Sequence, residues 1–66
     1  MKSDADERRE VFIEIMTLGT YAKVTAIDSV TGTEVSVTCP ANAPRATMEA
    51  AAVSKLEYVL KKSVPE

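Results

Sequence analysis

The stretch from residue 17 to residue 37, TLGTYAKVTAIDSVTGTEVSV, decides the fold. It holds both glycines of the chain, Gly19 and Gly32, and each one separates segments that are rich in β-branched residues. Such segments favour extended backbone, and a glycine between them indicates a turn. The pattern predicts three strands within these segments: EVFIEIMTLG (10–19), TYAKVTAIDS (20–29) and TEVSVTC (33–39).

The two turns also predict how the strands pair. The first glycine begins a two-residue loop where a type II′ turn requires a positive φ, and this loop places Leu18 opposite Tyr21. The second glycine ends a four-residue loop in the left-handed position, which pairs Asp28 with Thr33. Both registers place one apolar set on a single face of the sheet. The set consists of Val11, Ile13, Ile15, Ala22, Val24, Ala26, Val35, Val37 and Cys39.

The segment RATMEAAAVSKLEYVLKK (45–62) predicts a helix that packs on this apolar face, because it is dense in good helix formers. Asn42 is the expected cap, and Pro44 suits the first turn, where a missing N–H costs nothing. One arc of the helix is apolar. Its residues are Met48, Ala52, Val53, Leu56, Val59 and Leu60. The predicted fold class is α+β: a three-stranded antiparallel β-meander in the order 1-2-3, with one C-terminal α-helix packed on one face (β-β-β-α).

The length and composition limit what this domain can be. We expect a mobile charged tail over residues 1–9 and a single domain over residues 10–63. A domain of this size buries only about 60% of its unfolded surface, so added burial by oligomerisation is expected. The chain has one cysteine and no histidine, which excludes an internal disulfide and disfavours a zinc site. We therefore expect no metal and no cofactor.

Charge and hydropathy narrow the location and the partners. The formal net charge of −2 is the wrong sign for a protein that binds nucleic acid through its phosphates. No apolar segment approaches the ~20 residues of a membrane span, and the polar start has no signal-peptide core. The expectation is a cytoplasmic protein without membrane or nucleic-acid partners.

Cys39 is the most prominent candidate for chemistry, since it lies upstream of the predicted helix. A thiol near a helix N-terminus can have a lowered pKa and act as a nucleophile, but no histidine is present to serve as its base. The strand register instead places Cys39 opposite Ala22, beneath the helix, as a small buried side chain. We therefore predict no catalytic residue. An enzyme whose pocket is built from two subunits, with Cys39, Glu49 or Arg45 converging in it, is the least favoured alternative.

The opposite face of the sheet carries the candidate interface, because a solvated face is normally polar and this one is not. Its large apolar residues are Phe12, Met16, Leu18, Tyr21 and Ile27. They predict a homodimer and a protein partner. Two alternatives remain: the N-terminal tail folds back over Phe12 and Met16, or the residues are scattered surface hydrophobics. Pairing of the first strands of two copies and packing of two sheet faces both remain possible geometries.

Three short motifs of this chain are the most specific for a comparison with known families: G-x-Y-x-K-V-x-A-I-D (19–28), T-G-T-E-V (31–35) and K-L-E-Y-V-L (55–60). Through them, residues 10–62 resemble a small uncharacterised family of alphaproteobacterial proteins. The resemblance implies no activity and no catalytic residues. Some members carry an automatic serine hydroxymethyltransferase label, which this chain supports neither by its length nor by a lysine in a pyridoxal-phosphate context.

The sequence thus predicts a self-associating protein-interaction module that uses the open sheet face or an edge strand. A nucleic-acid-binding module is the first alternative, because three-stranded sheets with a packed helix occur in such proteins. The net charge disfavours it.

Overall fold

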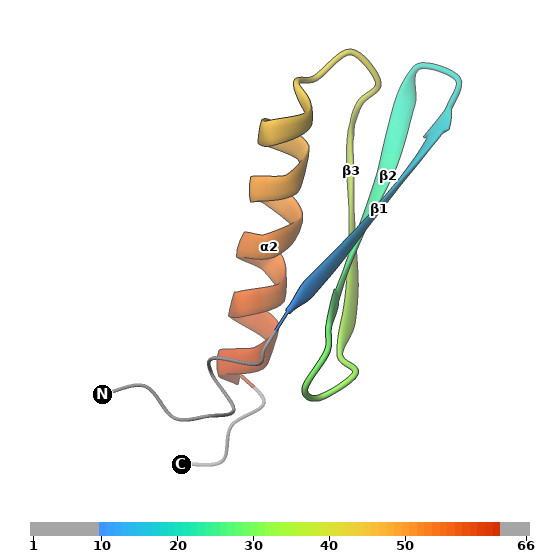
Figure 1. Ribbon diagram of the computed structural model, residues 1–66. Coiled ribbons are helices and arrows are strands. Elements are labelled where there is room, and N and C mark those ends of the chain that lie inside the picture. Colours follow the sequence, from blue (N-terminus) through green and yellow to red (C-terminus); the bar gives the residue numbers. More distant parts are fainter. Residues whose placement is uncertain (1–9, 63–66) are drawn as a thin grey trace.

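The computed structural model describes residues 10–62. The expected tail (1–9) and the last residue of the expected domain, Ser63, lie outside the described residues. The described elements are β1 (Val11–Leu18), β2 (Tyr21–Asp28), β3 (Glu34–Pro40) and α2 (Arg45–Lys62). The strands form one antiparallel sheet in the order β1-β2-β3, and α2 runs along one face of it (Figure 1). This arrangement confirms the predicted β-β-β-α fold.

Both predicted registers are confirmed. Leu18 pairs with Tyr21 in the first hairpin, and Ala22 pairs with Cys39 in the second. Gly19 has a φ of 66°, and no non-glycine residue within 10–62 has a positive φ, which is the φ pattern of a type II′ turn. Gly32 has a φ of 77°. The turns therefore have the left-handed glycines that the sequence predicted.

The second turn is closed by a buried carboxylate that the sequence analysis did not single out. The Asp28 side chain is fully buried, and its Oδ2 accepts hydrogen bonds from the Thr31 N–H (2.9 Å) and the Thr31 hydroxyl (2.7 Å). The backbone N–H of Asp28 donates to the Thr33 carbonyl at 2.8 Å. Aspartate commonly binds the backbone of its own turn in this way. Asp28 therefore fixes the loop as well as ending the strand.

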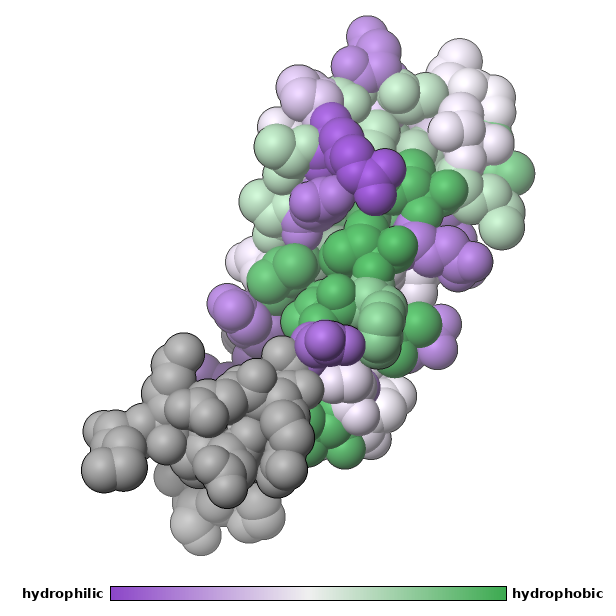
Figure 2. Space-filling view, viewed as in Figure 1, coloured by the Kyte–Doolittle hydropathy of each residue, from purple (hydrophilic) through white to green (hydrophobic). Residues whose placement is uncertain are grey.

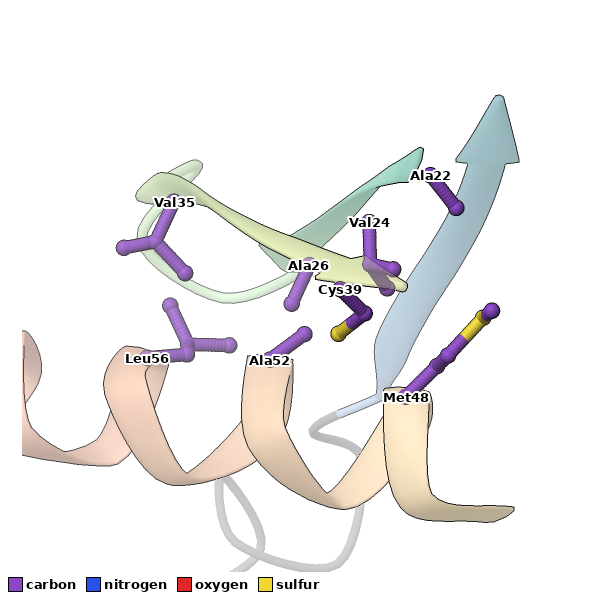
Figure 3. Close-up of a cluster of buried hydrophobic side chains, with 8 residues drawn as sticks. All are labelled: Ala22, Val24, Ala26, Val35, Cys39, Met48, Ala52 and Leu56. Carbon is purple, nitrogen blue, oxygen red and sulfur yellow. The ribbon is translucent and has the colours of Figure 1, made fainter. Parts of the chain in front are cut away.

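The core lies between α2 and the two strands β2 and β3 (Figure 3). Its buried residues are Ala22, Val24, Ala26, Val35, Cys39, Met48, Ala52 and Leu56. The small side chains of β2 let the helix approach closely, and all three of its core residues have no exposed surface. Burial of a side chain such as Leu56 stabilises a fold by about 1.5–3 kcal/mol.

The start of the helix corrects one prediction. The helix begins at Arg45, and the Met48 N–H donates to the Pro44 carbonyl at 3.0 Å, so Pro44 stands at the cap in place of Asn42. Proline restricts the residue before it to extended backbone, so the helix cannot extend back through Ala43. Asn42 lies in the preceding turn, where the Ala43 N–H donates to the Pro40 carbonyl at 3.0 Å.

Candidate protein interface

The five predicted interface residues all lie on the face of the sheet away from α2. Their places follow from the register, since residues directly opposite each other share a face. Four of them are exposed: Phe12 by 55%, Met16 by 52%, Leu18 by 41% and Tyr21 by 45%. Ile27 is half-buried. This open face therefore presents large apolar side chains to solvent.

A polar row divides these residues into two groups. Glu14, Thr25 and Ser36 lie side by side across the middle of the sheet. The Thr25 and Ser36 hydroxyls are 3.1 Å apart and form a hydrogen bond, and Thr25 is only 6% exposed. The five apolar residues were predicted as one candidate interface, with polar residues among them.

The two groups lie toward opposite ends of the sheet. Phe12 and Ile27 are directly opposite each other and form the Phe12 cluster. Met16, Leu18 and Tyr21 form the Leu18 cluster beside the first turn. Phe12 and Leu18 are about 20 Å apart along the strand at ~3.4 Å per residue. One copy of the chain therefore does not bring the five residues into a single patch.

The charges of the open face are mostly acidic. Glu14 and Glu34 are exposed there, and Lys23 is the basic residue among them. The basic side chains of the helix lie elsewhere: Lys62 stacks over the Tyr58 ring at 5.6 Å, and Lys55 reaches the edge of β3. A sheet face that binds single-stranded nucleic acid combines aromatic side chains with a basic groove, and this face has the opposite charge.

Strand β1 is exposed on both faces, which the sequence analysis did not predict. The strand consists mainly of large apolar residues, yet none of its residues is buried. Ile13 and Ile15 face the helix side and are only partly buried, and Val11 is 36% exposed. Figure 2 shows apolar surface on the side of the molecule where α2 and β1 are both in view. The cause is the position of α2, which packs mainly on β2 and β3.

The residues considered for chemistry do not form a site. Cys39 is 8% exposed and lies under α2 near Ala52, which agrees with the structural interpretation of this thiol (Figure 3). Arg45 instead pairs with Glu49 on the helix surface, with Nε and Oε2 2.7 Å apart. Within residues 10–62 no three histidine, cysteine or acidic side chains are grouped as a metal site would require.

The described part of the chain contains no helix with the length and apolar character of a membrane span.

A comparison with protein-family models matches residues 8–63 to a family described as "Domain of unknown function (DUF6898)". No curated protein and no solved structure matches the chain.

Proposed function

Because the chain belongs to the DUF6898 family of domains of unknown function, we propose its function from its surface: a small self-associating module that binds proteins through β1 and the open sheet face. Self-association is the first part of this proposal. Contact of the same edge or face with a protein partner is the second part.

The observation that carries the proposal is the exposure of β1. A strand of large apolar residues without a single buried member leaves unfavourable contact with water on both faces. Exposed clusters of large apolar side chains bordered by polar residues are characteristic of protein contacts. A domain of about this size also gains stability when a second chain adds buried area.

The charge of the open face supports a protein partner over a nucleic acid. Glu14 and Glu34 outnumber Lys23 there, and phosphates would be repelled. The nucleic-acid alternative requires salt-dependent retention on heparin at neutral pH. We expect the protein to elute from heparin without retention.

The enzyme alternative has less support than either binding function. It requires Cys39 to react, and the helix covers this residue. A thiol reagent added to the native protein should therefore modify Cys39 only slowly, at the rate at which the domain opens.

Light scattering coupled to size-exclusion chromatography tests self-association. We expect the wild-type protein to have the mass of a dimer at tens of micromolar. Phe12→Asp places a charge in the exposed apolar face and should shift the protein to monomer. Val30→Asp is the matched control, because Val30 is 47% exposed but lies in the second turn, away from the sheet face.

The Val30→Asp variant should remain a dimer. A wild-type protein that is a monomer, unchanged by Phe12→Asp, would contradict the proposed function.

A further inference from the structure

We propose that β1 pairs antiparallel with β1 of a second copy in one particular register, with Ile15 on the two-fold axis. This inference rests on the proposed self-association and specifies its geometry. The occupant of the open edge is therefore another copy of this chain. The product is a six-stranded sheet in the order β3-β2-β1-β1-β2-β3, with both helices on the same face.

The backbone of β1 offers hydrogen-bonding groups to such a partner. The Ser29 N–H donates to the Glu10 carbonyl at 2.9 Å, so the even-numbered residues of this strand bond to β2. In an antiparallel pair these groups alternate, so the odd-numbered residues direct their N–H and C=O groups away from the sheet. Within residues 10–62 no side chain forms a hydrogen bond to these outward groups of β1. The edge is therefore open for pairing.

The other edge of the sheet is partly occupied. The Lys55 ammonium of α2 donates to the Ser36 carbonyl of β3 at 2.9 Å. Pro40, at the end of β3, has no N–H to donate. A lysine over the edge and a proline within it are both devices that protect edge strands from pairing. The second copy therefore pairs with β1 and not with β3.

The alternation of faces restricts the register. Directly opposite residues of an antiparallel pair must lie on the same face of the sheet. Neighbouring residues of β1 point to opposite faces, so the two-fold axis must pass through a residue and not between two residues. Only axes at Glu14 and at Ile15 pair nearly the whole strand. An axis at Glu14 places the two Glu14 carboxylates directly opposite each other, and like charges in that position are destabilising. An axis at Ile13 shortens the pairing and places Phe12 against Glu14 of the second copy.

An axis at Ile15 joins the two apolar clusters that one copy keeps apart. It places Phe12 of one copy opposite Leu18 of the second copy. Since Ile27 pairs with Phe12, and Tyr21 pairs with Leu18, one apolar row then crosses four strands. It runs Ile27, Phe12, then Leu18 and Tyr21 of the second copy. The two-fold axis generates the same row at the other end of the sheet.

The same register separates the acidic side chains. Glu14 lies opposite Met16 of the second copy, and Met16 pairs with Lys23 within its own chain. Each Glu14 therefore shares a row with Lys23 of the second copy. On the helix side, Ile15 meets Ile15 and Ile13 meets Thr17 of the second copy. The apolar residues Phe12 and Leu18 thus face each other, and each Glu14 faces an uncharged side chain in place of a second Glu14, which favours this antiparallel pair.

A charge-pair exchange tests this register. The homodimer of each single variant, Phe12→Glu or Leu18→Lys, places two charges opposite apolar side chains. An equimolar mixture forms a heterodimer with one Glu–Lys row and one native Phe–Leu row. Native mass spectrometry of the mixture should show the heterodimer at about tenfold over the mean of the two homodimers. A mixture of Phe12→Glu with Met16→Lys is the control, because these residues face each other only with the axis at Glu14.

A cysteine ladder provides a second measurement that does not depend on new charges. Ile13→Cys, Glu14→Cys and Ile15→Cys are made in a Cys39→Ala background, so each chain holds one thiol. A residue on the axis has its own copy about 5.5 Å away between Cα atoms, within the range of a disulfide. Under mild oxidation, Ile15→Cys should form the disulfide-linked dimer at least about tenfold faster than the other two. Circular dichroism confirms that each variant is folded.

The outcomes separate the two proposals. A wild-type protein that stays monomeric in light scattering overturns self-association and this inference together. A wild-type dimer in which Ile13→Cys or Glu14→Cys links fastest overturns the register and leaves the proposed function standing. A dimer in which none of the three links overturns edge pairing in favour of face packing. Fastest linkage at residue 15, with preference for the Phe12→Glu and Leu18→Lys heterodimer, supports the inference.

Discussion

The two edge strands of the sheet have similar lengths, but one edge is covered by the rest of the chain and the other is not. At the β3 edge, Val35 and Cys39 are buried, Lys55 bonds to the Ser36 carbonyl and Pro40 removes a donor. At the β1 edge no residue is buried, although the strand consists mainly of large apolar side chains. The difference shows that one chain protects the β3 edge and leaves the β1 edge uncovered.

The width of a helix explains why one edge is covered and the other is not. A helix with its side chains is about 10 Å across, and strands are about 4.8 Å apart, so one helix covers roughly two strands. The short connection from β3 to α2 sets the helix beside β3. The core then forms over β2 and β3, and β1 lies beyond it.

The largest expected effect is a difference in the free energy of unfolding between a substitution under the helix and one on β1. Leu56→Ala removes a side chain that is 1% exposed and should lower the free energy of unfolding by about 2–5 kcal/mol. Leu18→Ala on β1 should lower the free energy of unfolding of the monomer by less than about 1 kcal/mol, because Leu18 is exposed. Urea unfolding of dilute protein measures both. Equal losses would contradict the division into covered and uncovered halves.

Proline substitutions distinguish the N–H groups of β1 that face β2 from those that face away from the sheet. Met16→Pro removes an N–H that faces β2 and leaves its partner carbonyl without a donor, which should cost about 1–3 kcal/mol. Thr17→Pro removes an N–H that faces away from the sheet and should leave the monomer folded. Thr17→Pro should nevertheless lower the dimer fraction in light scattering. A Thr17→Pro dimer as stable as wild type would argue against pairing through this edge.

The two turns that connect the edges to β2 are expected to be similarly sensitive. Gly19→Ala and Gly32→Ala each force a side chain into a left-handed backbone, which should cost about 1–2 kcal/mol. No atom lies within 4 Å of the added Cβ at either glycine, so the cost is in the backbone and not in packing. Gly32→Asn should recover part of the loss, because asparagine tolerates this conformation. Thermal unfolding monitored by circular dichroism measures all three variants.

The smallest expected effect concerns the protection of the β3 edge. Lys55→Met removes the hydrogen bond to the Ser36 carbonyl and should lower the free energy of unfolding by about 0.5–1.5 kcal/mol. Lys61→Met, on the exposed part of the same helix, is the matched control and should have almost no effect. Chemical unfolding at equal salt compares the two variants. A similar loss for both would show that the lysine at residue 55 does not stabilise this edge.

Most of the fold was predictable from local features. Gly19 and Gly32 required particular turns, and the alternation of apolar residues had to agree with those turns. A shift of one residue in the register would have moved Val24 out of the core, so the apolar pattern allowed only one register. The helix bounds were predicted correctly, but the cap was wrong, because Pro44 and its restriction on Ala43 outweighed the capping preference of Asn42.

The candidate interface was only partly predictable. The sequence placed Phe12 and Leu18 on the open face, and the predicted register already sets Glu14 opposite Thr25 in the row between them. The register does not give burial, and Thr25 on this open face is only 6% exposed. Burial in a sheet depends on residues of other strands, which a pattern along one strand does not contain.

The strand order, the registers and the face of each side chain follow from the sequence, because turns and alternation act over a few residues. The choice of strands that the helix covers follows from tertiary packing, since it depends on how Ala52 and Leu56 fit against the small side chains of β2. That packing buries β2 and β3 and leaves β1 exposed on both faces and at its edge. The surface proposed for self-association is therefore a consequence of where one helix lies.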